Sequence, residues 1–164
     1  KNKNRKSLGS KKKKEFFDKL ESLMTNLAHF IVKDGEGASK FIKISIYGAQ
    51  NYKDAKSFGM SIANSPLFKT AMAGSDSNWG RIIMALGKAG VGIENSKISI
   101  KFGKLLILKS GQILLSKNLK KINNYLKGKE IEISVTVGKG PANCSVWTCD
   151  LTKNYISINT DYRS

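Results

Sequence analysis

A helical pattern changes to a strand pattern across the stretch DGEGASKF, residues 34–41. Within it a single carboxylate, Glu36, has a glycine on each side, Gly35 and Gly37. Glycine adopts backbone angles that other residues avoid, and it lets a ligand approach the main chain. One interpretation is a carboxylate presented to a cationic or amino-bearing ligand, and the other is a polar loop whose acid faces water. Spacing alone favours the second, because loops are polar by default and only some carry function.

The chain has 164 residues, enough for one domain or for one domain and a piece of another. With 40% hydrophobic residues it should bury a core and not be wholly disordered. No apolar run approaches the ~20 residues that a membrane span needs. No apolar segment follows the basic start, so neither a secretory signal nor a membrane partner is expected. Because the first residue is Lys1 and not Met, we expect an excised or incomplete chain.

The formal net charge of +17 is typical of a protein that binds an anionic partner. Residues 1–14 are rich in Lys and Arg and contain no acid, so we expect a disordered or weakly helical basic tail there. Clustered basic residues attract nucleic acid, and a basic nucleic-acid-binding module is therefore the alternative function. Beyond the tail, lysines are spread over nearly every element, which a lysine-rich genome composition would also produce.

Two cysteines, Cys144 and Cys149, and one histidine, His29, limit the available chemistry. The cysteines are five residues apart in an extended region, so a regular strand points them to opposite faces. This disfavours a mutual disulfide and a zinc pair, and we expect free thiols in a reducing, cytoplasmic setting. Neither cysteine has a histidine base, and His29 has no serine at a motif position. The residues therefore predict no catalytic group and no metal site within this chain.

The first half of the chain reads as helix, strand and helix. Apolar spacing predicts a helix over residues 15–33 and a strand over residues 41–47, closed by Gly48. A second helix is expected after Asn51, which is a suitable N-cap. Its expected apolar face consists of Ala55, Phe58, Gly59, Ile62 and Ala63.

A short connection and a third helix follow. Residues 67–73 are expected to form an ordered connection to which the pattern assigns no type. The third helix should start near Trp79, with Asp76 or Ser77 as its cap and Gly90 as its end.

From residue 96 onward the apolar period changes mostly to two. The expected elements are a strand through residues 98–102, a hairpin with its turn at Ser110-Gly111 and flanks at 105–108 and 112–115, a helix through 119–126 ending at Gly128, a strand over 131–137, and extended segments over 143–151 and 154–159. In the last segment Asn159 lies on the face that need not be buried. The chain is thus predicted to be α+β, with mostly antiparallel strands and no evident βαβ repeat.

Seven blocks of sequence occur in a specific order from about residue 16 to the last residue. They are IVKDGEGASKF (31–41), ANSPL (63–67), KTA (69–71), NWGRI (78–82), ISIKFG (98–103), CDLT (149–152) and INTDYRS (158–164). Together they resemble ornithine acetyltransferase, the bifunctional glutamate N-acetyltransferase family of arginine biosynthesis. Any one block alone is weak, whereas the ordered set is specific.

The resemblance implies that this chain is the C-terminal part of the family's β chain. Residues 15–48 would form the end of an αββα sandwich, the aminopeptidase-like fold with an N-terminal threonine nucleophile. Residues 49–164 would form a smaller C-terminal α+β domain. The apolar stripe of the first helix would then pack on parts of the sandwich that lie outside this chain.

The family's activity, as the resemblance implies it, is acetyl transfer from N-acetylornithine to glutamate. A precursor cuts itself, and the new N-terminal threonine of the β chain becomes the nucleophile, with its own amine or a nearby group as base. Oxyanion donors come from the α chain. No catalytic residue is expected in this chain, and its expected partners are the α chain and the start of the β chain in a hetero-oligomer. No bound cofactor is implied, and use of acetyl-CoA as a second donor stays open.

Three residues match substrate-binding positions of the family: Glu36, Asn159 and the C-terminal Ser164. A carboxylate suits the amino group of ornithine, and an asparagine amide both donates and accepts. Among the departures from the family pattern, Ser75 and Ser77 stand where an acid and a proline are more usual. A substrate-binding fragment is therefore the leading hypothesis, with a nucleic-acid-binding module or a non-catalytic remnant as alternatives.

Overall fold

The computed structural model describes residues 9–94 and 97–162. The chain divides into two compact units, one ending at Ile31 and the other starting at Val32, and each is described by itself. No helix in the described ranges is long and apolar enough to cross a membrane.

Helix α1 spans Ser10–Lys33. It begins five residues before the predicted start at Glu15, because Lys11 to Lys14 are good helix formers whose side chains extend into water. Residues 10–14 of the expected disordered or weakly helical basic tail are thus helical, while residues 1–8 lie outside the described ranges. None of the residues in the predicted apolar stripe is buried. The exposed large side chains of α1 are those of the stripe, Phe16, Leu20, Leu23, Met24, Leu27, Phe30 and Ile31, and that of Phe17 outside it.

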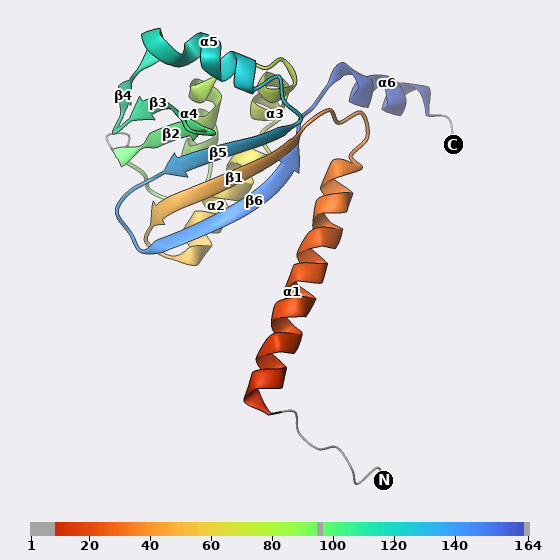
Figure 1. The fold of residues 1–164 in the computed structure, drawn as a ribbon. Coiled ribbons are helices and arrows are strands. Elements are labelled where there is room, and N and C mark those ends of the chain that lie inside the picture. Colours follow the sequence, from red (N-terminus) through yellow and green to blue (C-terminus); the bar gives the residue numbers. More distant parts are fainter. Residues whose placement is uncertain (1–8, 95–96, 163–164) are drawn as a thin grey trace. The chain divides into compact units, whose positions relative to one another are not determined.

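A six-stranded sheet forms the second unit, in the order β4-β3-β2-β5-β1-β6 (Figure 1). Its strands are β1 (Phe41–Ala49), β2 (Ser99–Phe102), β3 (Leu105–Lys109), β4 (Gln112–Ile113), β5 (Glu130–Thr136) and β6 (Ala142–Cys149). Only β1 and β5 pair in parallel among the strand pairs described, so the prediction of mostly antiparallel strands is confirmed.

The expected domain boundary between residues 48 and 49 falls inside β1. Strand β1 hydrogen-bonds on one edge to β5 and on the other to β6, and both partners come from the C-terminal part of the chain. Residues 15–48 were expected to form part of a separate sandwich. Their strand, β1, instead belongs to the same sheet as the strands of residues 49–164.

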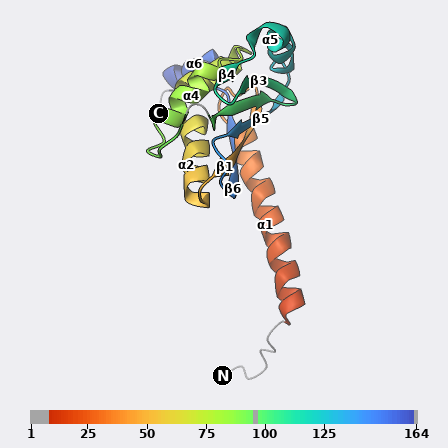
Figure 2. The same ribbon diagram turned by 90° about the vertical axis from the view of Figure 1, so that its left-hand side faces the viewer.

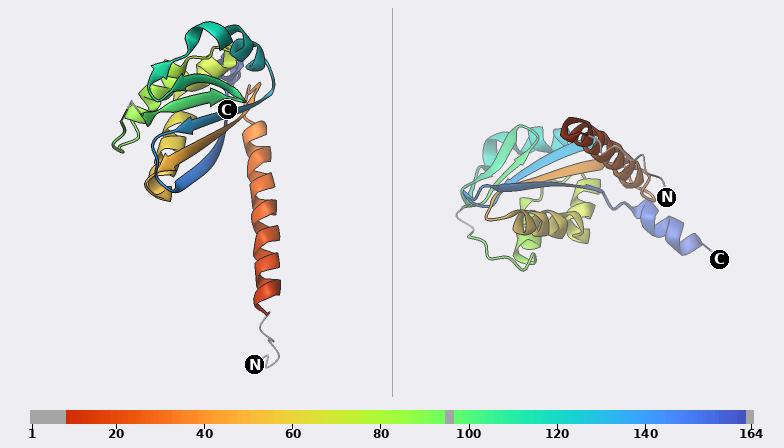
Figure 3. Two further views of the ribbon diagram at one scale, coloured as in Figure 1. Left: turned by 60° about the vertical axis from the view of Figure 1, so that its left-hand side comes forward. Right: turned by 90° about the horizontal axis from the view of Figure 1, so that it is seen from below.

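One face of the sheet is apolar and covered by helices. The alternation predicted for β1 places Ile42, Ile44 and Ile46 on this face, each with 0% exposure. Helices α2 (Tyr52–Ala63) and α4 (Trp79–Gly87) lie on one side of the strands, with α3 (Pro66–Ala73) beside them (Figures 2 and 3). Helix α5 (Leu115–Tyr125) packs on β3.

The helix ends test the predicted caps. Asn51 caps α2 as predicted, since its Oδ1 accepts from the Asp54 N–H at 2.9 Å. The untyped connection is α3, which Ser65 caps and which starts with proline. The cap of α4 is Asn78, so Asp76 and Ser77 were wrong predictions. The helix also ends at Gly87, three residues before the predicted stop.

The hairpin turn is confirmed, whereas the final segment was predicted wrongly. Ser110 and Gly111 both have positive φ, 47° and 77°, as a type I′ hairpin turn requires. Residues 154–159, predicted to be extended, form part of helix α6 (Lys153–Asp161). The alternation there is misleading because Ile156 and Ile158 are both exposed, so neither face of the segment reports a buried core. The local signal for a helix is Thr152, whose side chain caps the first turn.

Replacing Gly48 by Ala should destabilise the second unit by at least about 2 kcal/mol. Gly48 has φ +78°, and a Cβ there would lie 2.1 Å from the Gly138 carbonyl oxygen. The control is Gly87→Ala at the end of α4, where a Cβ meets nothing within 4 Å. Chemical denaturation measures both variants, and equal stabilities would contradict this close approach.

Candidate functional site

Two of the three predicted site residues meet in the structure. The Nδ2 of Asn159 donates to the Oε2 of Glu36 at 2.8 Å, across 123 positions of sequence. Glu36 lies in the loop before β1, and Asn159 lies on α6, which stands beside that loop (Figure 1). Ser164, the third predicted residue, lies outside the described residues.

The remaining atoms of this pair are acceptors. The same Nδ2 also donates to the Tyr155 carbonyl oxygen at 2.8 Å, so both amide hydrogens of Asn159 have acceptors. Its Oδ1 and the Oε1 of Glu36 then face solvent at an exposed position. A pair that offers a carboxylate and an amide oxygen, with no donor left over, favours an ammonium group as ligand.

A buried carboxylate, Asp150, fixes the loop that carries Glu36. Asp150 is only 3% exposed and accepts from the backbone N–H of Ser39 at 2.8 Å and of Lys40 at 2.9 Å. The Ser39 hydroxyl donates to its second oxygen at 2.5 Å. Three donors satisfy a carboxylate that would otherwise be costly to bury.

The loop also approaches α6 at the level of the backbone. Gly37 has φ +64°, and a Cβ there would lie 2.6 Å from the Tyr155 nitrogen. A Cβ on Gly35 would lie 3.0 Å from the Cys149 Sγ. The two glycines around Glu36 therefore serve close packing against the chain around α6, which the spacing alone did not reveal.

Lys40 is a buried amine beneath this loop. Its Nζ donates to the Met72 carbonyl oxygen and, at 2.8 Å, to the Ser75 hydroxyl. Burial lowers the pKa of Lys40 from the ordinary 10.5, and the nearby charge of Asp150 partly opposes this change. Ser75, one of the departures from the family pattern, thus contributes a neutral partner to the buried ammonium.

Residues Asp150 and Lys40 were not predicted as parts of the site. The only sequence signal for them is their position, because Lys40 directly precedes β1 and Asp150 directly follows β6. The two cysteines are free, Cys144 buried and Cys149 half-buried. Among residues 9–94 and 97–162, no group of three His, Cys, Asp or Glu side chains could hold a metal ion.

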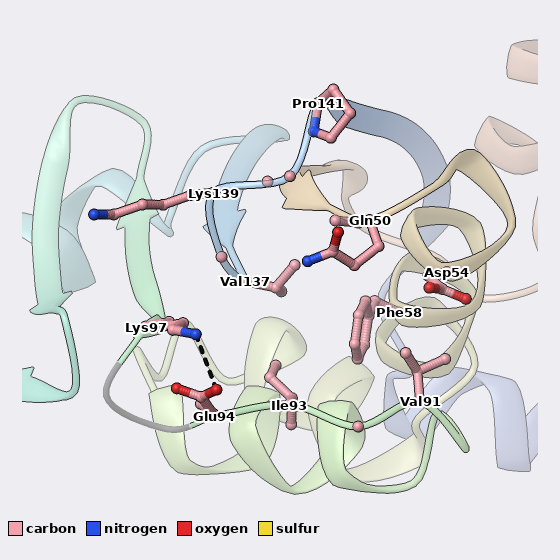
Figure 4. A pocket seen from close by; sticks show the side chains of 15 residues that line it. Gln50, Asp54, Phe58, Val91, Ile93, Glu94, Lys97, Val137, Lys139 and Pro141 are labelled. Atoms are coloured by element: carbon pink, nitrogen blue, oxygen red, sulfur yellow. Dashed lines mark hydrogen bonds and ion pairs between the residues drawn. The ribbon is translucent and has the colours of Figure 1, made fainter.

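A hollow of about 640 Å³ lies at the end of β1 that is opposite to the Glu36 loop (Figure 4). Gln50 points into it, above Phe58 and beside Val137 (Figure 4). Its charged lining residues are two acids and two lysines, and one acid and one lysine, Glu94 and Lys97, pair at 2.9 Å. No predicted site residue lines this hollow. Because its positive and negative charges are equal in number, they favour neither an anionic nor a cationic ligand.

The comparisons with known proteins agree with the sequence blocks. A model of the ArgJ family matches residues 2–164. This chain belongs to the ArgJ family. It is 48% identical over 156 residues to the arginine biosynthesis bifunctional protein ArgJ of Caulobacter vibrioides, covering 95% of this chain and 39% of that protein. Identity to the protein of the same name from Zymomonas mobilis is 52% over 151 residues, covering 90% of this chain and 37% of the relative.

A solved structure supports the fold. The crystal structure of arginine biosynthesis bifunctional protein ArgJ from Bacillus halodurans matches with a TM-score of 0.90 and 34% identity, covering 96% of this chain and 75% of that chain. The α+β class predicted from sequence is therefore confirmed. The chain spans well under half the length of the two curated relatives.

Gly37→Ala should separate the loop from α6. The left-handed backbone costs alanine about 1–2 kcal/mol, and the added Cβ overlaps the Tyr155 nitrogen. We expect faster amide hydrogen exchange throughout α6 with the sheet protected as before. The control is Gly92→Ala, where a Cβ meets nothing within 4 Å. Unchanged exchange in α6 would contradict the close packing.

Lys40→Met should change how stability depends on pH. Because folding lowers the pKa of Lys40, the unfolded chain binds more protons between that lowered pKa and 10.5. The wild-type chain should therefore gain stability relative to Lys40→Met as the pH rises toward 10.5. Urea denaturation at several pH values measures this difference, with the exposed Lys56→Met as control. A difference that stays constant with pH would contradict it.

Proposed function

We propose that this chain supplies the amine-binding part of an enzyme that transfers acetyl from N-acetylornithine to glutamate. The observation that carries the proposal is the Glu36–Asn159 pair, which leaves only acceptor oxygens for a ligand. Membership of the ArgJ family supports it, since the matched relatives are named bifunctional proteins of arginine biosynthesis. The same membership gives no support to the alternative of a nucleic-acid-binding module.

In this proposal Glu36 binds the free ammonium of N-acetylornithine. The Glu36 carboxylate supplies the opposite charge, and the Asn159 Oδ1 accepts a further N–H from the same group. Holding that end of the substrate fixes the position of the acetylated amine, where the chemistry takes place. We include Ser164 in the binding set by analogy with the family.

The reacting groups come from outside this chain. The acetyl carbon would bond to a threonine oxygen while its bond to the ornithine nitrogen breaks, and the leaving amine takes a proton. Glutamate then accepts the acetyl group and frees the threonine. The relatives' greater length supports a nucleophile and oxyanion donors located in the rest of the ArgJ polypeptide. The chain alone should therefore be inactive.

That remaining polypeptide is also the proposed partner of α1. Eight large apolar side chains on α1 are exposed, an arrangement typical of a helix that packs on another structure. The αββα sandwich that the sequence blocks imply would be completed there, as a hetero-oligomer. We place the assembly in the cytoplasm, where thiols such as Cys144 and Cys149 stay reduced.

Glu36→Gln should weaken binding of N-acetylornithine by about tenfold to a hundredfold, because a hydrogen bond to a charged group contributes about 1.5–3 kcal/mol. The variant keeps the size of the side chain and removes its charge. Titration calorimetry on the chain measures the affinity, with the exposed Glu21→Gln on α1 as control.

The same variant is then assayed for acetyl transfer after the chain is joined to the part of the Caulobacter vibrioides protein that it does not match. We expect no transfer by the chain alone, transfer by the joined protein, and a raised KM for the donor with Glu36→Gln. Acetyl-CoA serves as a second donor in the assay. Failure of both binding and transfer by the wild-type sequences would overturn the proposed function.

A further inference from the structure

The ligand-binding pair has no apolar packing of its own to align it. Glu36 and Asn159 are both exposed, and α6 contains no buried residue. A nine-residue helix is also shorter than the ~12–15 residues at which isolated helices become even marginally stable. The alignment of Glu36 with Asn159 therefore depends on the backbone contact of Gly37 with the first turn of α6 and on a few hydrogen bonds between the loop and the start of α6.

One hydroxyl makes contacts on both sides of that junction. The Thr152 Oγ1 donates to the Gly37 carbonyl oxygen at 2.6 Å, next to Glu36. The same atom accepts from the Asn154 N–H at 3.2 Å and so caps α6. A hydroxyl can donate and accept at once, which a methyl group of the same size cannot.

The backbone around Thr152 is itself fixed. Two residues earlier, Asp150 accepts the hydrogen bonds of Ser39 and Lys40, and the Leu151 N–H donates to the Lys69 carbonyl oxygen at 3.2 Å. The Thr152 hydroxyl therefore projects from a hydrogen-bonded backbone segment toward the Gly37 carbonyl oxygen and the first turn of α6. Among the side-chain hydrogen bonds of the described residues, only those of Thr152 link the Gly37 carbonyl oxygen to the first turn of α6.

We propose that Thr152 is the positioning residue of the Glu36–Asn159 pair. Its hydroxyl sets the start of α6 relative to the Gly37 carbonyl, and two helical turns later this places the Asn159 amide at the Glu36 carboxylate. Thr152 does not touch the ligand. That Thr152 positions the pair is argued from the contacts alone, whereas the effect of Thr152 on ligand affinity rests on the proposed function.

The first test needs no ligand. The side-chain amide resonances of Asn159 in the ¹⁵N-labelled chain report its hydrogen bond to Glu36, and Glu36→Ala supplies their positions when this bond is absent. Thr152→Val should move them to those positions, and Thr152→Ser should leave them at the wild-type positions. Thr152→Ala, which removes the hydroxyl without adding an atom, should match Thr152→Val. Wild-type resonances in both hydroxyl-free variants would overturn the proposal.

The second test measures affinity for N-acetylornithine. Removing a cap and its partner bond should weaken binding about fivefold to tenfold in Thr152→Val, with less than about a twofold change in Thr152→Ser. Thr160→Val is the control, because the Thr160 hydroxyl bonds only the Ser157 carbonyl within α6.

A double variant separates positioning from general damage. In the Glu36→Ala background, Thr152→Val should weaken binding no further, since the pair to be positioned is gone. A further loss as large as in the wild-type background would refute a role through Glu36. If the wild-type chain binds no N-acetylornithine and the joined protein transfers no acetyl group, the proposed function fails, while the resonances of Asn159 still decide the role of Thr152.

Discussion

The carboxylate of Asp150 joins the end of β6 to the start of β1, and the rest of the site depends on this junction. A nearly fully buried carboxylate is tolerable only with enough donors, and the N–H groups of Ser39 and Lys40 meet that need. The backbone that supplies them leads directly into β1, which is hydrogen-bonded along both edges. The loop with Glu36 is thus fixed at one end by the sheet and by the hydrogen bonds that its backbone donates to Asp150.

The same junction explains which parts of the molecule the sequence could predict. In elements with one buried face, such as β1, β5 and α2, apolar residues recur in the sequence at the period of the strand or helix. Their core residues were therefore predicted correctly. Segment 154–159 was predicted wrongly because its apolar residues are exposed, so the alternation of Ile156 and Ile158 carries no information about burial. Asp150 is invisible to periodicity, since its donors come from residues about 110 positions away. Glu36 and Asn159 were chosen as site residues from family resemblance and not from spacing, and their hydrogen bond to each other was not predicted.

Charge works differently at the scales of the protein and of the site. The chain carries a net charge of +17, whereas the proposed ligand-binding group is an anion. A positive protein attracts glutamate, which is anionic at neutral pH, over distances up to about 10 Å at ordinary ionic strength. A zwitterion such as N-acetylornithine gains little from that field and depends on the local carboxylate of Glu36. Under the proposed function, the two substrates would respond differently to salt.

Helix α6 buries none of its residues, and this separates its stability from that of the sheet. A helix of this kind is expected to open locally while the strands stay paired. Each opening removes Asn159 from Glu36, so a ligand that bridges the two residues binds only the closed form. Binding and local folding then share one free energy, and the measured affinity is the intrinsic affinity multiplied by the closed fraction. Under the proposed function, residues that never contact the substrate would in this way adjust the apparent affinity of the site.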